Sequence, residues 1–452
     1  MKTNKAVAYS AQTHEGGRAD AHQSPLIELG RAVSTCLLWE NTFYENGNDI
    51  AARIASLCAQ VKPSEVSALA VKARTDLKLR HVPLFLCIQL LKLKAGKIAG
   101  DTIAAVVKRP DEMGELIALY RKEKRVPLAA QLKKALAKMF PTFSPYQLAK
   151  WNGDAAVKLR DVMFMVHPKP KDETQAAVWK QLVDGTLESP DTWEVALSSG
   201  KDKKATWTRL LTEKKLGYMA LLMNLRNMSE AGIEPSLVEQ SLRDGAKGSK
   251  ALPFRFISAY KHAPQYAQAL SDAMEVAVEG ELAGTTALLL DVSGSMDAII
   301  SNKGELKRYE TAAALAVLVR GLSKSCRIFA YATSMAEIVN IKGLGLIDAV
   351  KQGMQRLGGS TNTAQALAHL QMKCPSVDRV ILLTDEQAHD GIHPLWAPHG
   401  YIINVAPYAP GLDTGGQWAR INGWSERVID WIQLHEQEPQ AMTPRRGHGE
   451  GG

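Results

Sequence analysis

The chain has few cysteines and no long apolar run, and each shortage excludes a class of protein. The five cysteines are odd in number and scattered, without a CxxC pair, so neither a disulfide framework nor a zinc ribbon is indicated. No apolar stretch approaches the roughly 18 residues that a membrane helix needs, and the first residues lack the apolar segment of a secretory signal. The sequence therefore predicts a reduced, cytoplasmic protein without a membrane partner.

What the chain does have is a globular composition with basic charge gathered in one segment. Apolar residues make up 46% and charged residues 23%, which is typical of folded domains, and 452 residues suggest two or three of them. Residues 51–150 contain 19 Lys and Arg against 7 Asp and Glu, a net charge of +12, whereas residues 281–452 contain 15 against 17. Such a cluster is typical of a protein that binds nucleic acid or another acidic surface, although solvated helix faces would give the same count.

Residues 26–280 are dominated by helical periodicity. Apolar residues recur at three- and four-residue spacing, Pro and Gly fall mostly between these segments, and no stretch alternates convincingly as a strand does. Consecutive short helices joined by short turns favour a stacked solenoid of HEAT-like helical pairs. Among the expected helices are 64–79, 84–93, 128–139, 155–165, 173–183, 216–228 and 235–243.

The pattern changes near residue 281 to short apolar runs that alternate with helical stretches. This alternation predicts a parallel sheet covered on both faces. The predicted fold class is therefore mainly α plus α/β, with a flexible arm at 1–25, a helical-repeat domain at 26–280, a Rossmann-like domain at 281–435 and a disordered tail at 436–452. The expected strands are 285–290, 327–332, 379–384 and 401–405, and the expected helices are 309–322, 344–356, 363–370 and 426–433.

Polar residues follow the predicted strands. Asp291, Ser293 and Ser295 come after the first strand, Thr361 lies in a Gly- and Ser-rich loop that opens a helix, and Asp385 ends a later strand. Because ligands bind at the carboxyl ends of strands in an open α/β sheet, we expect these side chains to lie close together. Carboxylate and hydroxyl oxygens suit Mg²⁺ or Mn²⁺ and suit zinc poorly. The sequence therefore predicts a divalent metal site, with Mg²⁺ ahead of Mn²⁺.

The same five positions resemble the metal-ion-dependent adhesion site (MIDAS) of von Willebrand factor A domains, which opens with a strand and Asp-x-Ser-x-Ser. An enzymatic interpretation has less support. A phosphatase of the haloacid dehalogenase type needs an Asp where Ser293 stands, and the chain has neither a GxxxxGK[ST] phosphate loop nor a GxSxG elbow. We expect no catalytic residues and no enzyme activity.

Several helical segments resemble the TROVE module of the Ro autoantigen family, whose members carry an A domain behind a helical-repeat region. The resemblance implies a monomeric ring of helical repeats closed by the A domain. It also implies RNA binding rather than catalysis, with single-stranded 3′ ends of misfolded or defective non-coding RNAs in the hole and Y RNAs or stems on the basic outer surface. The segments that carry it are 40–44 (ENTFY), 79–85 (LRHVPLF), 132–139 (LKKALAKM), 146–151 (YQLAKW), 160–168 (RDVMFMVHP), 220–228 (ALLMNLRNM), 422–425 (NGWS) and 428–431 (VIDW).

Carried over residue by residue, the resemblance assigns RNA contacts to His167 and Lys150. The family's second basic position, four residues after that Lys, is Asp154 here, a charge reversal that departs from the Y-RNA contact. The nearby aromatic residues are expected to pack between helices, with stacking on unpaired bases as the alternative; they are Phe140, Phe143, Tyr146 and Trp151. The basic clusters, which supply phosphate affinity, add Arg80, Arg121, Arg125, Lys133, Lys134 and Lys138 as RNA-binding candidates.

Three hypotheses about function remain open. The first is an RNA quality-control or ribonucleoprotein scaffold protein that binds non-coding RNA. The alternative is an adaptor that docks a protein, such as an exonuclease, through the metal site and has no dedicated RNA ligand. A metal-dependent hydrolase is a third reading, for which the sequence offers no nucleophile or base.

Overall fold

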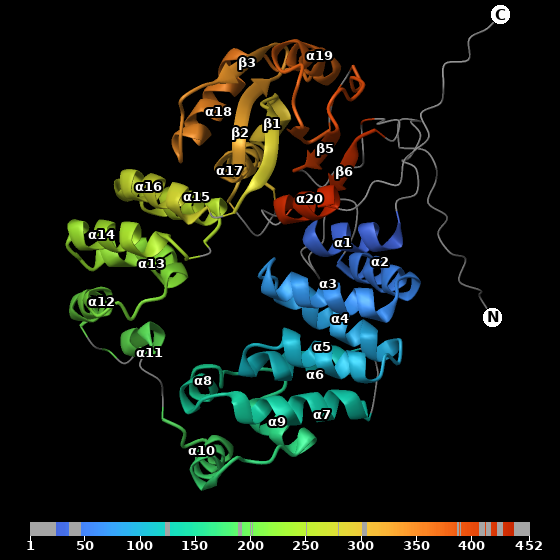
Figure 1. Ribbon diagram of the computed structural model, residues 1–452. Helices are drawn as coiled ribbons and strands as arrows, with labels where there is room; N and C mark the ends of the chain where they lie inside the picture. Colours follow the sequence, from blue (N-terminus) through green and yellow to red (C-terminus); the bar gives the residue numbers. More distant parts are fainter. Residues whose placement is uncertain are drawn as a thin grey trace, which may run out of the picture.

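The helices and strands form two arms of stacked helices and a sheet domain that joins their ends, so that the described residues make a ring (Figure 1). The first arm spans residues 24–188, the second arm 192–278 and the sheet domain 280–437. The structure is a computed structural model that describes residues 24–35, 47–122, 127–188, 192–198, 200, 202–249, 251–278, 280–300, 305–386, 388, 390–405, 412, 417–422 and 428–437. The predicted arm at 1–25 and tail at 436–452 lie almost wholly outside these ranges, although the last helix continues to Gln437.

The first arm is a stack of short helices with a hydrophobic core of its own, which extends from Leu29 to Leu182. Local signals fix several helix ends. Ser144 caps one helix by accepting a hydrogen bond from the Gln147 N–H, and Gly185 ends another in the left-handed conformation. The helices are α1 (Pro25–Thr35), α2 (Gly47–Gln60), α3 (Pro63–Thr75), α4 (His81–Lys92), α5 (Lys97–Val106), α6 (Pro110–Lys122), α7 (Ala130–Met139), η1 (Phe140–Thr142), α8 (Pro145–Lys150), α9 (Leu159–Val166) and α10 (Glu173–Asp184).

The second arm continues the helical stack but shares its core with the sheet domain. Trp207, Phe256 and Leu270 belong to the same buried cluster as Leu288 and Ile403 of the sheet. The second arm is therefore built onto the sheet domain, whereas the first arm is a separate body of packed side chains. Its helices are α11 (Trp193–Ser198), α12 (Lys203–Thr212), α13 (Tyr218–Glu230), α14 (Pro235–Ala246), α15 (Pro253–His262), η2 (Pro264–Tyr266) and α16 (Ala267–Ala277).

The sheet domain has six strands in the order β3-β2-β1-β4-β5-β6, and all neighbours are parallel except β2 and β3. Alternate residues of the central strand face two different cores, Ala287 and Leu289 on one side and Leu288 and Leu290 on the other. The strands are β1 (Leu282–Asp291), β2 (Ser323–Tyr331), β3 (Met335–Ile338), β4 (Arg379–Thr384), β5 (His399–Asn404) and β6 (Ala419–Asn422). The helices are η3 (Gly294–Asp297), α17 (Arg308–Leu322), α18 (Gly345–Arg356), α19 (Thr363–Lys373) and α20 (Val428–Gln437).

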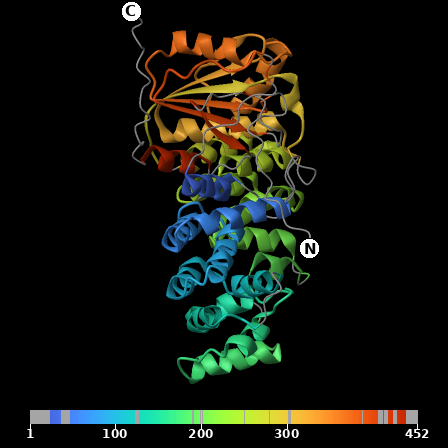
Figure 2. The same ribbon diagram turned by 90° about the vertical axis from the view of Figure 1, so that its right-hand side faces the viewer.

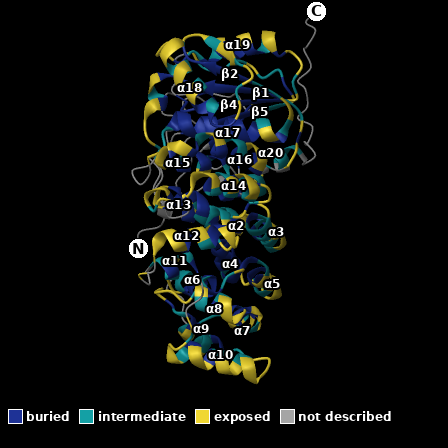
Figure 3. Ribbon diagram, turned by 90° about the vertical axis from the view of Figure 1, so that its left-hand side faces the viewer, coloured by how far each residue is buried: buried dark blue, intermediate teal, exposed yellow. Residues whose placement is uncertain are grey.

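The predicted parallel sheet is confirmed, and the structure adds two edge strands, β3 and β6, to the predicted ones. Both β3 and β6 have only four residues and no continuous apolar run, so the sequence pattern did not predict them. The predicted helix at 155–165 begins later, at Leu159, because residues 152–158 form a loop that is exposed from 152 to 156. Figure 2 shows the sheet domain at one end of the helical column, and Figure 3 shows its strands and α17 buried while α10 at the opposite end is largely exposed.

Polar contacts close the ring on both sides of the sheet domain. On the first-arm side, a guanidinium N–H of Arg31 in α1 donates to the Arg420 carbonyl of β6 over 2.8 Å. On the second-arm side, the Lys261 ammonium of α15 reaches the Glu310 carboxylate of α17 at 3.0 Å and the Glu305 carbonyl at 2.7 Å. Both arms thus make polar contacts with the sheet domain. The first arm adds packing between separate cores, whereas the second arm shares one core with the sheet domain.

Candidate metal site and nucleic-acid interface

The strand order places the carboxyl ends of β1 and β4 where ligand sites form in this kind of fold. The order 3-2-1-4-5-6 reverses direction between β1 and β4, and the crevice at such a switch point is the usual binding position. Asp291 ends β1 and Asp385 follows β4, and both carboxylates are fully buried.

Hydrogen bonds hold the Asp291 carboxylate in one orientation. The Ser293 N–H donates to its Oδ1 over 2.8 Å, and the Thr384 hydroxyl donates to its Oδ2 over 2.7 Å. The hydroxyl oxygens of Ser293 and Ser295 lie 3.2 Å apart beside it. Burial, followed by repulsion from the Asp385 carboxylate, raises the pKa of Asp291 to about 6. Two buried carboxylates in one crevice favour either a bound cation or protonation.

An arginine already faces this crevice. Arg308, the first residue of α17, is 6% exposed, and its Nη1 lies 2.9 Å from Asp385 Oδ2 and 3.0 Å from the Ser295 carbonyl oxygen. The guanidinium therefore bridges two of the loops that carry predicted metal ligands. No local pattern predicts this contact, because Arg308 and Asp385 are far apart in the chain and only the tertiary fold brings them together.

Thr361 lies in the loop before α19 and is buried. Its neighbour Asn362 donates its N–H to the Ala332 carbonyl, just beyond β2, which places this loop beside the carboxyl end of that strand. The structure thus brings Asp291, Ser293, Ser295 and Asp385 together and positions the Thr361 loop at the same edge. Within the part of the chain that the structure describes, no group of three or more His, Cys, Asp and Glu forms a metal cluster, so a cation here would depend on two carboxylates and hydroxyls.

The residue after Asp385 connects this edge to the first arm. Glu386 is buried at a φ of +58°, a left-handed backbone conformation that is strained for a residue with a side chain. Its carboxylate lies 3.2 Å from Arg420 Nε and accepts a hydrogen bond from the Asn404 amide over 3.2 Å. Arg420 is the residue whose carbonyl receives Arg31, so the crevice and the closure of the ring share one chain of polar contacts.

The predicted lysine cluster of the first arm is exposed on one helix. Lys133, Lys134 and Lys138 all lie on the solvent side of α7, and the opposite side of that helix is buried. Lys150 is also exposed, at the end of α8. These four ammonium groups are accessible to a polyanion.

The aromatic residues beside this cluster divide into two kinds. Phe140 and Phe143 are buried, which confirms the predicted core packing, but Tyr146 is 50% exposed, so that prediction is wrong for Tyr146. The Lys150 ammonium lies 5.8 Å from the centroid of the Tyr146 ring and 5.6 Å from that of Trp151. Tyr146 escapes burial because it is the second residue of a six-residue helix, whose buried residue is Leu148.

The remaining predicted RNA contacts have different surroundings. His167 is exposed and adopts a left-handed φ of +49° directly after α9. Arg80 is half-buried, and its guanidinium binds the carboxylates of Asp111 at 2.8 Å and Glu115 at 3.1 Å, so it also has a structural role. Arg121 is exposed, with Nη2 2.9 Å from the Met165 sulfur, and Arg125 lies outside the described residues.

Asp154, at the position of the family's second basic residue, is exposed. Its carboxylate lies 3.0 Å from the Lys158 ammonium, four residues further along the chain. The charge reversal therefore has a local partner and draws one nearby lysine into an ion pair.

Comparison with known proteins agrees with this architecture. Residues 185–274 match the TROVE domain, and residues 286–402 match the Ro60 vWA domain. The chain thus carries a segment that matches a TROVE domain, followed by one that matches a Ro60 vWA domain. The TROVE match coincides closely with the second arm, and the vWA match runs from within β1 into β5 of the sheet domain.

A solved structure supports the fold of this chain, and two curated relatives match one segment of it. The crystal structure of the Deinococcus radiodurans Ro (RSR) protein superposes with a TM-score of 0.65 over 91% of this chain and 99% of that one, at 16% identity, which establishes a shared fold. Telomerase protein component 1 is 38% identical over 79 residues in Mus musculus and 37% over 79 residues in Rattus norvegicus. Those matches cover 16% of this chain, which spans only 3% of the length of these two relatives.

No helix among the described residues is both long enough and apolar enough to cross a bilayer.

Proposed function

We propose that this chain, which matches a TROVE domain and a Ro60 vWA domain, binds non-coding RNA with a single-stranded 3′ end, Y-like RNAs included, as an RNA quality-control or ribonucleoprotein scaffold protein. The observation that carries the proposal is the exposed Tyr146 ring with the Lys150 ammonium beside it, in the same arm as the α7 lysines. Lysines attract phosphates without regard to sequence, and an exposed ring stacks on unpaired bases. Together, the lysines and the exposed ring suit an RNA whose single-stranded end lies next to a double-stranded stem.

The test compares a hairpin that has a single-stranded 3′ tail with the same hairpin made blunt. Gel-shift titrations at several salt concentrations should show tighter binding of the tailed RNA and a steep loss of affinity with salt, at a log–log slope of about −0.7 per neutralised phosphate on a single strand. Tyr146→Ala should weaken the tailed RNA more than the blunt one. The matched control is Tyr260→Ala, a partly exposed tyrosine of the second arm. Equal affinity for both hairpins would contradict the proposal.

We also propose that Mg²⁺ binds at the ends of β1 and β4, held by Asp291, Ser293, Ser295 and Thr361, with Asp385 bound directly or through water. The donor set fits, because it offers only hard oxygens around two buried carboxylates. When bound, the ion would supply an electropositive point for a carboxylate or phosphate of a partner. Arg308 shares Asp385, so its guanidinium and the cation compete for the same negative charge.

This competition makes the metal proposal testable. Arg308→Gln should bind Mg²⁺ about tenfold more tightly than the wild type in calorimetry, since a neighbouring positive charge is removed. Lys307→Gln is the matched control, because it removes a charge from the next residue, whose ammonium binds Asp297 instead. Weaker Mg²⁺ binding by the Arg308 variant would show that the guanidinium helps to build the site.

The second candidate function is a protein adaptor that uses the metal site, with an exonuclease as one class of partner. The buried oxygen donors at the β1 and β4 ends favour it, since a carboxylate of a partner could complete the coordination. We propose binding without catalysis in either case. Turnover of RNA or nucleotides by the purified protein that disappears in Asp291→Ala would overturn that part.

A further inference from the structure

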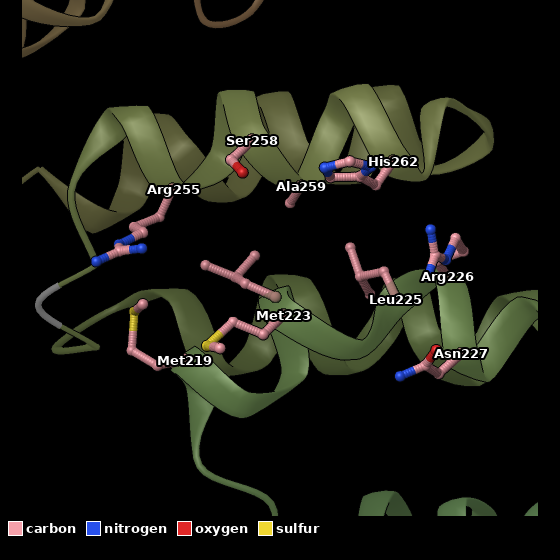
Figure 4. Close-up of a pocket in the computed structure, with 10 residues that line it drawn as sticks. Met219, Met223, Leu225, Arg226, Asn227, Arg255, Ser258, Ala259 and His262 are labelled. Carbon is pink, nitrogen blue, oxygen red and sulfur yellow. The ribbon is translucent and has the colours of Figure 1, made fainter. Parts of the chain in front are cut away.

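A cavity of about 370 Å³ lies between α13 and α15 of the second arm (Figure 4). Its floor is apolar, formed by methionine and leucine side chains of α13, with Met223 70% exposed. Its polar groups are cationic or neutral, and no Asp or Glu lines it. The lining residues are Met219, Leu222, Met223, Leu225, Arg226, Asn227, Arg255, Ser258, Ala259 and His262.

The basic groups stand at the two ends of this apolar floor. Figure 4 shows Arg255 above Met219 at one end, and His262 with Arg226 at the other. Arg255 and His262 are seven residues apart on α15, which corresponds to about 10 Å along a helix. The Arg226 guanidinium also lies 3.5 Å from Glu230, and His262 Nε2 lies 3.8 Å from Glu305, two exposed and therefore weak ion pairs.

We infer that the α13–α15 pocket is a subsite for about three consecutive nucleotides of single-stranded RNA. A stacked strand advances about 3.4 Å per nucleotide, so the distance between the two basic ends matches such a segment. Arginine provides planar, multiple donors for phosphate oxygens, and the thioether and leucine surface receives base faces. This inference rests on the proposed function and adds a contact in the arm opposite the α7 lysines.

The side-chain chemistry favours a nucleic acid over an acidic peptide. An acidic peptide needs cations along its length, whereas this pocket has cations at its ends and an apolar surface between them. Flat bases between phosphates have that same alternation of apolar surface and negative charge. The charge count does not reveal the pocket, because residues 192–278 contain 12 Lys and Arg against 9 Asp and Glu, a net charge of only +3.

The test uses the full chain and the tailed and blunt hairpins described above, with 4-thiouridine in the tail. Ultraviolet crosslinking followed by mass spectrometry should place crosslinks in peptides of α13 and α15. The double variant Arg226→Gln/Arg255→Gln should lose about tenfold in affinity for tailed RNA and keep its affinity for blunt RNA. The matched control is Lys203→Gln/Lys204→Gln, which removes two exposed charges from α12 of the same arm.

The outcomes separate this inference from the proposed function. If tailed RNA binds but crosslinks fall only in the first arm, and the double variant binds as the wild type does, the subsite is overturned while RNA binding stands. If no RNA binds, both fail. Displacement of the RNA from these helices by poly-glutamate as readily as by poly-uridine would assign the pocket to acidic peptides and overturn the nucleotide subsite.

Discussion

The two arms of the ring look alike as stacks of helices, but they are different kinds of structural unit. The first arm has its own core, from Leu29 to Leu182, whereas the core of the second arm is continuous with the sheet domain. The TROVE match begins at residue 185, close to this division. Periodicity placed a domain boundary near 280, but the packing places the division between separate cores near 190. A boundary between helices and strands is therefore not a boundary between cores.

The charges follow the same division. The first arm contains the segment of net charge +12, and its lysines stand on exposed helix faces, while the second arm is nearly balanced and has an apolar cavity with basic ends. Under the proposed function, the first arm would contact the backbone of structured RNA and the second arm would hold a few unpaired nucleotides. The ring would then offer two different surfaces to one RNA.

The largest effect is expected when a large buried side chain is truncated in each core, which tests the difference between the two arms most directly. Phe256→Ala in the second arm should destabilise the sheet domain by about 3–5 kcal/mol, because the same buried cluster continues into the sheet. Phe140→Ala, its counterpart in the first arm, should lower the stability of that arm by a similar amount and leave the sheet domain unchanged. Hydrogen exchange of peptides from β1 and β4 separates the two outcomes. Equal loss of protection in both variants would mean that the ring unfolds as one unit.

The next largest effect is expected from a substitution in the crevice at the carboxyl ends of β1 and β4. Asp291→Asn should stabilise the metal-free protein at pH 7.5, by on the order of 3 kcal/mol, because it removes a buried charge that repels Asp385. A folded-state pKa of about 6 against an ordinary 3.8 means that the wild type loses stability as the pH rises from about 4 to 6. The advantage of the variant should therefore vanish below pH 4 and stay constant above pH 6.

Thermal unfolding in EDTA across that pH range measures this effect. With Mg²⁺ added, the wild type should gain stability by mass action and Asp291→Asn should not. The gain should appear in the sheet domain and the second arm, which share a core, and be absent from the first arm. A gain that extends equally to α3–α9 would show that the polar chain through Glu386, Arg420 and Arg31 couples the crevice to the first arm.

The third effect concerns the surface of the first arm. Replacing Lys133, Lys134 and Lys138 together by Ala should weaken binding of tailed and blunt RNA alike by about 10- to 100-fold, and flatten the salt slope by about 2. The affinity lost with these phosphate contacts should not depend on the RNA sequence or on whether the RNA has a tail. The control is Lys203, Lys204 and Lys247→Ala, three exposed lysines of the second arm. If the two triple variants behave alike, the charge contrast between the arms has no functional meaning.

The sequence predicted what periodicity and local spacing encode. The buried parallel strands were found because their apolar runs are continuous, and the Asp-x-Ser-x-Ser loop because it follows one of them. Arg308 was missed as a partner of Asp385, since nothing local links α17 to the end of β4. The exposure of Tyr146 was not predicted, because a six-residue helix is too short to show an apolar face. The core that the second arm shares with the sheet domain was not predicted either, because periodicity shows which residues are buried but not which elements they pack against.

The smallest expected effect tests the threaded strand. His167 is exposed at a left-handed φ of +49°, so His167→Ala would confuse backbone strain with loss of the imidazole. His167→Asn is the cleaner change, because Asn tolerates this conformation while lacking the ring. It should weaken binding of tailed RNA by about five- to tenfold, the lower end of the range for one stacked base, and leave binding of blunt RNA unchanged. His167→Gly, which is also free of strain, should match it in gel-shift titrations; equal weakening of tailed and blunt RNA would place His167 on the outer surface of the ring with the lysines.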